Sequence, residues 1–513
     1  MGKCPYGRRF PEACCRELQK LKEAVYHKIQ GPNQHWWGLA VVCMGTFMST
    51  YDTGAVSVSL PLVMISFKTG LTMVSWVLIA YLLVSSSLLL PAGYLADILG
   101  RKKIYNTGFI VFILGSTLCG LSQNQVQLII FRSFQAVGAA MLQTSSFAIV
   151  TSAFPARDRG RGLGFLSSMA AIGITSGPAI GGFIADTFGW RGIFFLNVPL
   201  GLAGAVMTYL VLQEDVSPKP SSGLLQKFDL PGACISALAI CSLLVGLTLG
   251  QRGNWSSFET LFFLGTGIAA MIIFPWYEAH RGNPLVDMAL FKSRTFTVNN
   301  IARFICFLST AATSLLMPFY LQVVLGFSPF QAGLLIAPIS LIHAVLSPLS
   351  GWLANYIRTQ VLSSCGMAIM ALGLYLLSRL NLSYGVRDIL LRLVLFGIGY
   401  GIFQTPNNTS IMDSVDRKMY GITSGIMAFV RQTGHALGAA MASAIVVTSM
   451  FSRVGSVSIY SLKRDRGLLA DADALLAFAA GIGNAFLVVA LLCSLGVVIS
   501  LMRGKTVRDQ GQL

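Results

Sequence analysis

The chain alternates between long apolar runs and short polar segments. Apolar runs of about 20 residues, with few charges inside them, recur from residue 38 to residue 504. Each run is long enough to cross a hydrocarbon core of about 30 Å. Because lipid offers the backbone no hydrogen-bond partners, we expect each run to be a helix. The pattern predicts fourteen spans, at residues 38–61, 74–97, 104–122, 126–154, 163–185, 190–212, 230–251, 257–277, 296–325, 329–354, 360–378, 388–412, 421–450 and 474–502.

Composition supports a protein that lies largely in lipid. The 513 residues are 54% hydrophobic and only 11% charged, whereas soluble proteins carry about 25% charged residues. The formal charge of +17 is explained by membrane topology. If both termini are cytoplasmic, most Lys and Arg residues fall in the tails and the cytoplasmic loops. The loop 451–473 departs from this rule, since it is external in that topology and yet basic. The sequence contains no basic stripe with interleaved aromatic residues, so we expect no nucleic-acid partner.

The polar tails and the cysteines add little chemistry. Residues 11–29 alternate basic and apolar side chains at helical spacing, which fits either a helix on the inner leaflet or a solvated basic tail. The ten cysteines form no C-x-x-C pair. We therefore expect neither a zinc site nor a redox site, and no cofactor.

A faint repeat links the two ends of the apolar region. The fourth span reads R-S-F-Q-A-V-G-A-A-M-L-Q-T from Arg132, and the twelfth reads R-L-V-L-F-G-I-G-Y-G-I-F-Q-T from Arg392. Both have an Arg, a stretch of small residues and then Gln-Thr. Such similarity is expected of a transporter built from two parallel halves.

Several motifs sit at the ends of spans or inside them. After the second span, G-Y-L-A-D-I-L-G-R-K-K runs from Gly93 to Lys103. The fourth span begins R-S-F-Q-A-V-G at Arg132. The fifth contains I-T-S-G-P-A-I-G-G (174–182), and W-R-G-I-F-F-L-N-V-P-L-G follows (190–201). Further strings are Y-D-T-G-A-V-S-V-S-L-P (51–61), M-P-F-Y-L-Q-V-V-L-G-F-S-P-F-Q-A-G (317–333) and R-Q-T-G-H-A-L-G (431–438).

Taken together, these motifs resemble the fourteen-span drug/proton antiporters of the major facilitator superfamily, over about residues 38–450. The resemblance implies an all-α integral membrane protein with two pseudo-symmetric six-helix bundles and two extra central helices. The parts that it implies are a basic cytoplasmic tail (1–37), the first bundle (38–212), a cytoplasmic linker (213–229), two additional helices (230–278), a cytoplasmic loop (279–295), the second bundle (296–502) and a cytoplasmic tail (503–513).

The resemblance also assigns roles to two motifs. In the loop after the second span, Gly93, Asp97, Gly100, Arg101 and Lys102 match the superfamily's spacing and imply a cytoplasmic gate. Asp97 is expected at a neighbouring helix N-terminus or beside Arg101, where the pair would latch the two halves.

The fifth span looks like the antiporter signature. There a Gly-Pro step kinks the helix and glycines allow tight packing. The residues concerned are Gly177, Pro178, Gly181 and Gly182.

Asp52 is the only acid well inside a predicted span, which makes it a functional candidate because a charge there costs about 2.5–3.5 kcal/mol. Helix rise places Asp52 about 21 Å from the inner face, and Arg132 at about the same depth. We expect a proton switch in which Arg132 holds Asp52 ionised. Burial favours the protonated carboxyl group and Arg favours the carboxylate, so the access state sets the proton affinity.

Other polar residues in spans are candidates for a substrate cavity, namely Gln135, Gln143, Tyr320, Gln404, Asn407, Asn408 and Arg431. The amides of the twelfth span either line the cavity or join helices. His343 and His435 are read as packed histidines or as proton carriers. With one intramembrane acid and four intramembrane Arg residues, a multiply charged cation fits poorly. Neutral amphiphiles, anionic drugs or lipid-like compounds fit better.

The leading function is proton-coupled efflux of amphipathic small molecules by a monomer in the cell membrane, with both termini cytoplasmic. A uniporter, or an importer or exporter of a lipid, siderophore or other metabolite, is the alternative. An enzyme is not expected, because the spans lack H-E-x-x-H, G-x-S-x-G and paired carboxylates. A channel would need a polar filter. The absence of G-x-x-x-x-G-K-[ST] indicates secondary transport.

Overall fold

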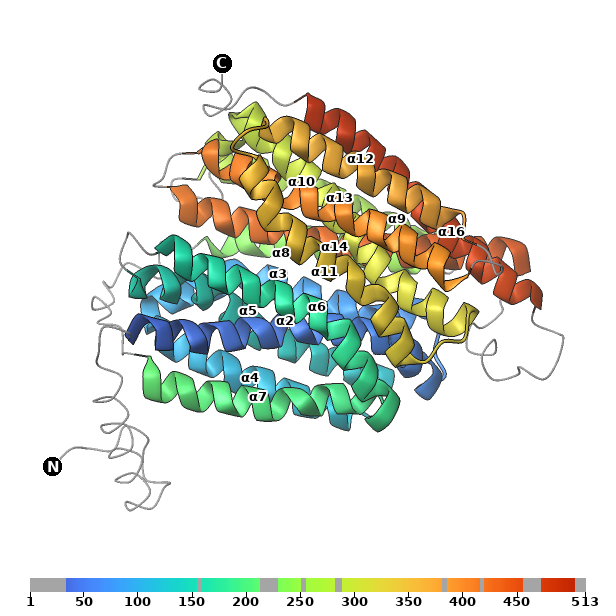
Figure 1. Ribbon diagram of the computed structural model, residues 1–513, viewed down its shortest axis with the longest axis horizontal. Helices are drawn as coiled ribbons and strands as arrows, with labels where there is room; N and C mark the ends of the chain where they lie inside the picture. Colours follow the sequence, from blue (N-terminus) through green and yellow to red (C-terminus); the bar gives the residue numbers. More distant parts are fainter. Residues whose placement is uncertain are drawn as a thin grey trace, which may run out of the picture.

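The computed structural model describes residues 34–154, 159–212, 229–250, 255–281, 288–380, 385–415, 419–454 and 472–502. Within these ranges the chain forms fourteen long α-helices, each within a few residues of a predicted span (Figure 1). They are α2 (Gln34–Ser66), α3 (Leu71–Leu99), α4 (Arg101–Leu121), α5 (Gln125–Ala153), α6 (Arg159–Phe188), α7 (Trp190–Val211), α8 (Leu230–Gly250), α9 (Phe258–Ala279), α10 (Arg294–Phe319), α11 (Pro329–Leu353), α12 (Thr359–Ser378), α13 (Val386–Asp413), α14 (Tyr420–Val454) and α16 (Ala472–Leu501).

Two short elements flank α10. The 3-10 helix η2 (Met288–Lys292) precedes it, and the π-helix η3 (Tyr320–Val324) continues it. The N-terminal tail before residue 34, most of the linker 213–229, residues 282–287 of the loop 279–295, most of the loop 451–473 and the tail 503–513 lie outside the described residues. The partition of the chain into seven parts therefore stays a prediction.

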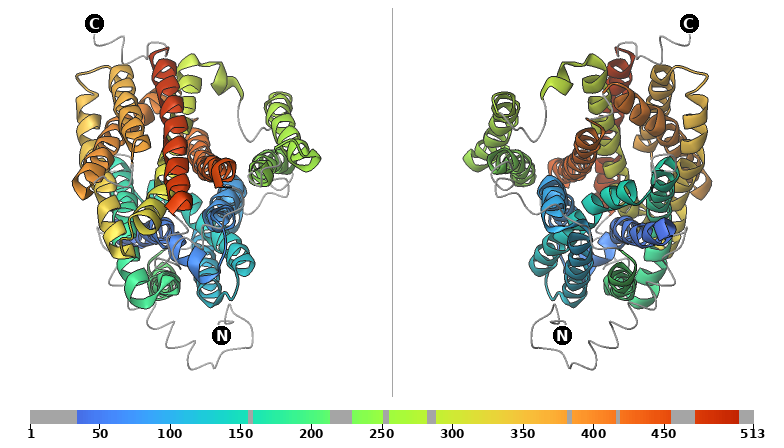
Figure 2. Two further views of the ribbon diagram at one scale, coloured as in Figure 1. Left: turned by 90° about the vertical axis from the view of Figure 1, so that its right-hand side faces the viewer. Right: turned by 90° about the vertical axis from the view of Figure 1, so that its left-hand side faces the viewer.

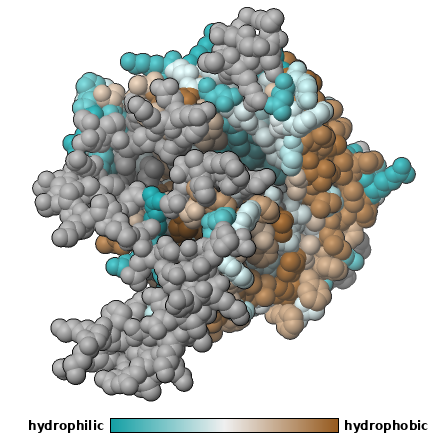
Figure 3. Space-filling view, turned by 60° about the vertical axis from the view of Figure 1, so that its left-hand side comes forward, coloured by the Kyte–Doolittle hydropathy of each residue, from teal (hydrophilic) through white to brown (hydrophobic). Residues whose placement is uncertain are grey.

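Eleven of the described helices are long and apolar enough to cross a membrane. The apolar stretch of α8, Cys234–Gly250, is shorter. The remaining two, α2 and α13, are the helices that contribute Asp52 and Asn408 to the polar sites below. A broad hydrophobic surface covers one side of the molecule, as expected for side chains that face lipid (Figure 3).

The packing follows the same scheme in both halves. In the first half α2 packs against α6 and α7, α4 against α5 and α7, and α3 against α5. In the second half α10 packs against α14 and α16, α12 against α13 and α16, and α11 against α13. Each contact of the first half thus has a counterpart in the second, which makes the two six-helix bundles pseudo-symmetric.

Small residues allow the equivalent helix pairs to approach closely. A Cβ atom on Gly138 of α5 would lie 2.5 Å from the backbone nitrogen of Phe112 of α4. A Cβ atom on Gly399 of α13 would lie 2.4 Å from the backbone nitrogen of Met370 of α12. Only glycine permits this spacing, so the small-residue stretches inside the internal repeat specify the same helix contact twice.

The two bundles meet along α3 with α14 and along α6 with α11. They press together most closely near the start of α11. A Cβ atom on Gly333 would lie 2.1 Å from the carbonyl oxygen of Pro178, and one on Gly182 would lie 2.5 Å from that of Pro329. Nearby, Gln322 Nε2 donates to the carbonyl oxygen of Val58 at 2.7 Å. We call this end of the interface the closed end.

The two additional helices, α8 and α9, form a hairpin beside the bundles (Figure 2). α8 packs against α3 and α14, the same two helices through which the bundles meet on that side. Trp76 Nε1 of α3 donates a hydrogen bond to Thr248 Oγ1 of α8 at 3.1 Å. The hairpin therefore covers one seam between the halves.

Candidate functional site

An ion pair lies inside the first bundle. Arg132 of α5 donates from Nη1 to Oδ2 of Asp52 of α2 at 2.6 Å, and both side chains are fully buried. The structure thus brings together the two residues that the depth estimate places at one level. Burial of two charges carries a large desolvation cost, which only close pairing and further hydrogen bonds offset. The surroundings of the pair supply those bonds.

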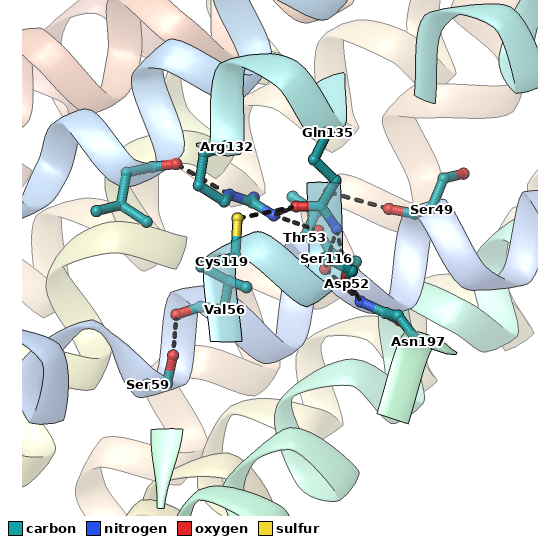
Figure 4. A network of polar contacts seen from close by, with 11 residues as sticks. Ser49, Asp52, Thr53, Val56, Ser59, Ser116, Cys119, Arg132, Gln135 and Asn197 are labelled. Atoms are coloured by element: carbon teal, nitrogen blue, oxygen red, sulfur yellow. Dashed lines mark hydrogen bonds and ion pairs between the residues drawn. The ribbon is translucent and has the colours of Figure 1, made fainter. Parts of the chain in front are cut away.

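Two amides complete the environment of the Asp52 carboxylate (Figure 4). Oδ1 accepts hydrogen bonds from Asn197 Nδ2 of α7 at 2.7 Å and from Gln135 Nε2 at 3.2 Å. Both amides also donate to Ser116 Oγ of α4, at 3.1 and 2.9 Å. Side chains from four helices, α2, α4, α5 and α7, therefore join in one hydrogen-bonded network around the carboxylate.

The Arg132 guanidinium is held on three sides. Besides Asp52, Nη1 donates to Gln135 Oε1 at 2.6 Å, and Nε donates to the carbonyl oxygen of Val77 of α3 at 3.2 Å. The guanidinium lies 4.2 Å from the centre of the Tyr81 ring, a cation–π distance. Its buried Nη2 has no hydrogen-bond partner among the described residues. That donor is available if the carboxylate changes its charge or position.

A central cavity of about 1860 Å³ lies between the two bundles. Its walls come from both bundles and from the hairpin, including Ile240 of α8 and Phe274 of α9. Neither Asp52 nor Arg132 lines it, but Thr53 and Tyr81 do. Because Thr53 follows Asp52 along α2 and Tyr81 lies against Arg132, these two residues separate the ion pair from the cavity.

The cavity is nearer to one end of the molecule. On α5 its lining includes Gln143 and Ser146, near the helix C-terminus, and on α13 it continues to Asp413, the last residue. These ends lie on the same side as the α3–α4 turn at Gly100, opposite the closed end. Figure 3 views the molecule from this side and shows hydrophilic residues around a hollow.

Four of the seven residues predicted for the cavity line it: Gln143, Gln404, Asn408 and Arg431. Whether they bind a substrate stays a prediction.

The other three predicted cavity residues do not line it, and their assignment to the cavity is corrected here. Gln135 belongs to the buried network around Asp52. Tyr320 is fully buried in η3. Asn407 is also fully buried, and its Nδ2 donates to the Asn299 side chain of α10 at 3.3 Å. Its amide therefore joins two helices of the second bundle, which was the other interpretation of this residue.

Basic side chains of the second bundle reach the cavity. Arg303 of α10 lines it, donates from Nε to the carbonyl oxygen of Met427 at 3.1 Å and donates from Nη1 to Asn408 Oδ1. Arg431 of α14 lines it too, and its Nη2 donates to Gln143 Oε1 of the first bundle at 3.4 Å. Arg303 falls within the predicted span 296–325, but hydropathy assigns it no role, because hydropathy does not show which way a side chain faces.

Both intramembrane histidines line the cavity and contact aromatic rings. His343 stacks on Tyr400 with 4.3 Å between ring centres, and His435 lies 5.2 Å from the ring of Phe307. These contacts describe packed histidines. The role of these histidines as proton carriers stays a prediction.

The predicted gate residues lie around the α3–α4 turn. Gly100 has φ +97°, a conformation that favours glycine, and it ends α3 and starts α4. Arg101 Nη1 donates to the carbonyl oxygen of Ala148 at 3.0 Å, and Lys102 Nζ to that of Tyr209 at 3.0 Å. These bonds stay within the first bundle. The side chain of Asp97 lies outside the described residues, while Gly93 lines the cavity.

The predicted kink residues bring α6 against two neighbours. α6 continues through Pro178, and a Cβ atom on Gly181 would lie 2.4 Å from Cβ of Ala55 of α2. Gly177 packs against the backbone of Tyr51, which is also in α2. Gly182 faces α11 at the closed end. The glycines therefore permit contact both within the first bundle and between the two bundles.

Among the described residues, no group of three His, Cys, Asp or Glu side chains is arranged to hold a metal ion. The side chains at the site include a buried carboxylate, the buried guanidinium groups of Arg132 and Arg303, the half-buried guanidinium group of Arg431 and neutral amides.

Comparison with known proteins gives consistent results. The model of the Major Facilitator Superfamily matches residues 42–439. The chain is 34% identical to "Riboflavin transporter RibZ" of Clostridioides difficile, over 81% of this chain and 89% of that protein. It is 32% identical to "Multidrug resistance protein Stp" of Mycobacterium tuberculosis, over 79% of this chain and 74% of that protein.

Solved structures share the fold. A bacterial homologue of the human lysosomal transporter Spinster, described as inward-facing and unoccupied, superposes with a TM-score of 0.69. The alignment covers 92% of this chain and 97% of that one, at 15% identity.

Proposed function

The chain belongs to the major facilitator superfamily, and from this premise we propose that it exports amphipathic small molecules in exchange for protons. Family and fold indicate a transporter rather than an enzyme, and a multi-pass protein of the cell membrane. Secondary active transport follows from the family. Proton coupling, the direction of transport and the substrate are the proposal.

The observation that carries the proposal is the buried pair of Asp52 and Arg132. When Asp52 is ionised, the pair is neutral and Arg132 is held in place. Protonation would remove the charge that holds the guanidinium, leaving a buried cation that must find other acceptors. Because Arg132 lies on the ring of Tyr81, a residue of the cavity wall, its movement would reach the cavity. A proton thereby biases the equilibrium between two conformations.

We further propose that this conformation is inward-facing, with both termini in the cytoplasm. The distribution of Lys and Arg supports that orientation, since it puts the α3–α4 turn on the cytoplasmic side. The cavity then lies toward the cytoplasm, where substrate enters. The closed end, with the contact of Gly333 and Pro178, seals the outer side. Export requires this contact to open while the cytoplasmic side closes.

The test is substrate-driven proton flux in proteoliposomes. A panel of cationic, neutral and anionic amphiphiles is added, and the pH inside the vesicles is followed. The protein should move protons when a substrate is added, and Asp52→Asn should abolish this flux while still inserting. Asp186→Asn, which removes an exposed acid of α6, is the matched control and should behave like the unmodified protein. Transport driven by a pH gradient in Asp52→Asn would refute the proton switch.

A uniporter, or a carrier for one metabolite, is the second candidate, because one relative at 34% identity is named a riboflavin transporter. The same vesicles distinguish the two. A uniporter would move its substrate down its own gradient whether or not a pH gradient is imposed, and Asp52→Asn would leave the rate unchanged.

A further inference from the structure

Two cavity-lining arginines of the second bundle, Arg303 and Arg431, differ from Arg132 in their partners. In the described part of the chain, no carboxylate lies within ion-pair distance of Arg303 or Arg431. Their hydrogen bonds go to neutral acceptors, which are the carbonyl oxygen of Met427 and the side-chain oxygens of Asn408 and Gln143. Neutral acceptors leave the charge of a guanidinium group uncompensated in a low-dielectric interior.

The two guanidinium groups lie near each other. Arg303 donates to the carbonyl oxygen of Met427, which stands one helical turn before Arg431 in α14, and His435 stands one turn after it. Arg303, Arg431 and His435 line the cavity. The acid among the described lining residues is Asp413, which ends α13, more than a helical turn beyond Asn408. An anion placed between the two guanidinium groups would relieve their repulsion and accept hydrogen bonds from both.

Aromatic rings surround this position. The Arg303 guanidinium lies 4.9 Å from the centre of the Phe307 ring. The stacked pair of His343 and Tyr400 lies on the neighbouring helices α11 and α13, and both residues face the cavity. Flat apolar surfaces next to cationic donors fit a planar molecule that carries a negative charge at one edge.

We propose that the central cavity binds aromatic anions, with the anionic group between Arg303 and Arg431 and the ring system against Tyr400 and Phe307. The inference rests on the proposed transport function and names its substrate class. It assigns ligand recognition to the second bundle, where the charges are open to the cavity. Arg132 does not compete for the anion, because Asp52 neutralises it behind the cavity wall.

The experiment is equilibrium dialysis of the full-length protein in lipid nanodiscs with three probes that share one ring system. The probes are naphthalene-2-sulfonate, the neutral naphthalene-2-sulfonamide and the cationic 2-naphthylmethylammonium. The sulfonate should bind about ten-fold or more tightly than the sulfonamide, as expected for a charge-assisted hydrogen bond, and the ammonium probe should bind least. Empty nanodiscs correct for partition into lipid.

Substitutions locate the binding site. Arg303→Gln and Arg431→Gln should each lower the affinity for the sulfonate toward that for the sulfonamide, while the affinity for the sulfonamide stays the same. Arg303→Lys, which keeps the charge, should retain part of the preference. Arg294→Gln removes the same charge from an exposed position at the start of α10 and should leave all three affinities unchanged.

Binding needs no proton gradient, so the outcome is independent of proton coupling. A protein that shows no proton flux can therefore still prefer the sulfonate, so failure of the antiport proposal and failure of this inference are distinguishable. Equal affinities for the three probes, a preference for the ammonium probe or no measurable binding of the sulfonate would overturn the proposal. An equal loss of sulfonate binding in Arg294→Gln and Arg303→Gln would overturn the assignment to Arg303.

Discussion

The two bundles share a helix arrangement but differ in what they bury at equivalent positions. Asp52 stands nine residues before Pro61 in α2, and Ser309 stands nine residues before Pro318 in α10. Asp52 accepts a hydrogen bond from Asn197 of α7. Ser309 Oγ lies 3.0 Å from Cys493 Sγ of α16, the counterpart of α7. The first bundle thus buries a charge where the second buries a neutral contact.

At the cavity it is the second bundle, not the first, that contributes the charged side chains. The second bundle exposes Arg303 and Arg431 to it, whereas the first bundle keeps Arg132 paired behind its wall. Symmetric scaffolds therefore do not require symmetric chemistry. The difference supports a division of labour in which the first bundle responds to protons and the second binds the ligand. Four substitutions test this comparison.

The largest effect is expected from Arg132→Leu. Removal of the guanidinium leaves the Asp52 carboxylate buried without a counter-charge, which should lower the free energy of unfolding by about 3–5 kcal/mol. Equilibrium unfolding in mixed micelles measures this change in the free energy of unfolding. The double variant Asp52→Asn with Arg132→Leu should recover most of the loss, because both charges are then gone. If the double variant is no more stable than Arg132→Leu alone, the ion pair is not the source of the loss.

Asn197→Leu should cause the next largest decrease in the free energy of unfolding. The amide donates to the carboxylate at 2.7 Å, and hydrogen bonds to charged groups contribute about 1.5–3 kcal/mol. Proton flux in proteoliposomes should fall as well, because this bond helps to hold the carboxylate in place. Unchanged proton flux with lowered stability would limit Asn197 to a structural role.

Much of this arrangement can be predicted from the sequence. Apolar runs predict all fourteen helices, since the length of a span is set by the membrane. Helix rise alone predicts that Asp52 and Arg132 lie at one depth. The depth of a residue in the membrane does not specify which way its side chain points, however. The sequence therefore predicts a place at the cavity for Gln135, which faces the interior of its own bundle, and predicts no role for Arg303, which faces the cavity.

Other features depend on contacts between distant segments. Asn197 is part of a quoted motif, but nothing in the motif shows that its amide meets Asp52 from another helix. The hairpin of α8 and α9 carries no motif, and its place in the cavity wall follows from packing against α3 and α14. Predicting either feature would require knowing which residues from distant parts of the sequence contact each other.

The closed end offers a test that does not involve charge. Gly333→Ala places a methyl group 2.1 Å from the carbonyl oxygen of Pro178, and such overpacking costs about 1–3 kcal/mol. Because the strain exists only while the bundles touch there, the equilibrium should shift toward opening at this end. A cysteine introduced at the buried Ser75, whose hydroxyl lies 3.5 Å from that of Ser443, should then react faster with a thiol reagent.

The matched control for this test is Gly265→Ala in α9. A Cβ atom there would meet no atom within 4 Å, so the reaction rate of the cysteine at position 75 should not change. Equal acceleration in both variants would show that the reagent reports a general loosening rather than opening of the closed end.

The smallest effect is expected from Ser309→Ala, the counterpart of a change at Asp52. The hydroxyl donates to the carbonyl oxygen of Ile305 at 2.8 Å and contacts Cys493, and neutral bonds of this kind contribute about 0.5–1.5 kcal/mol. The free energy of unfolding should fall within that range, and proton flux in proteoliposomes should stay the same. Because Asp52→Asn is expected to abolish the flux, the two variants compare equivalent positions directly. Loss of flux in Ser309→Ala would place proton coupling in both bundles and contradict the division between them.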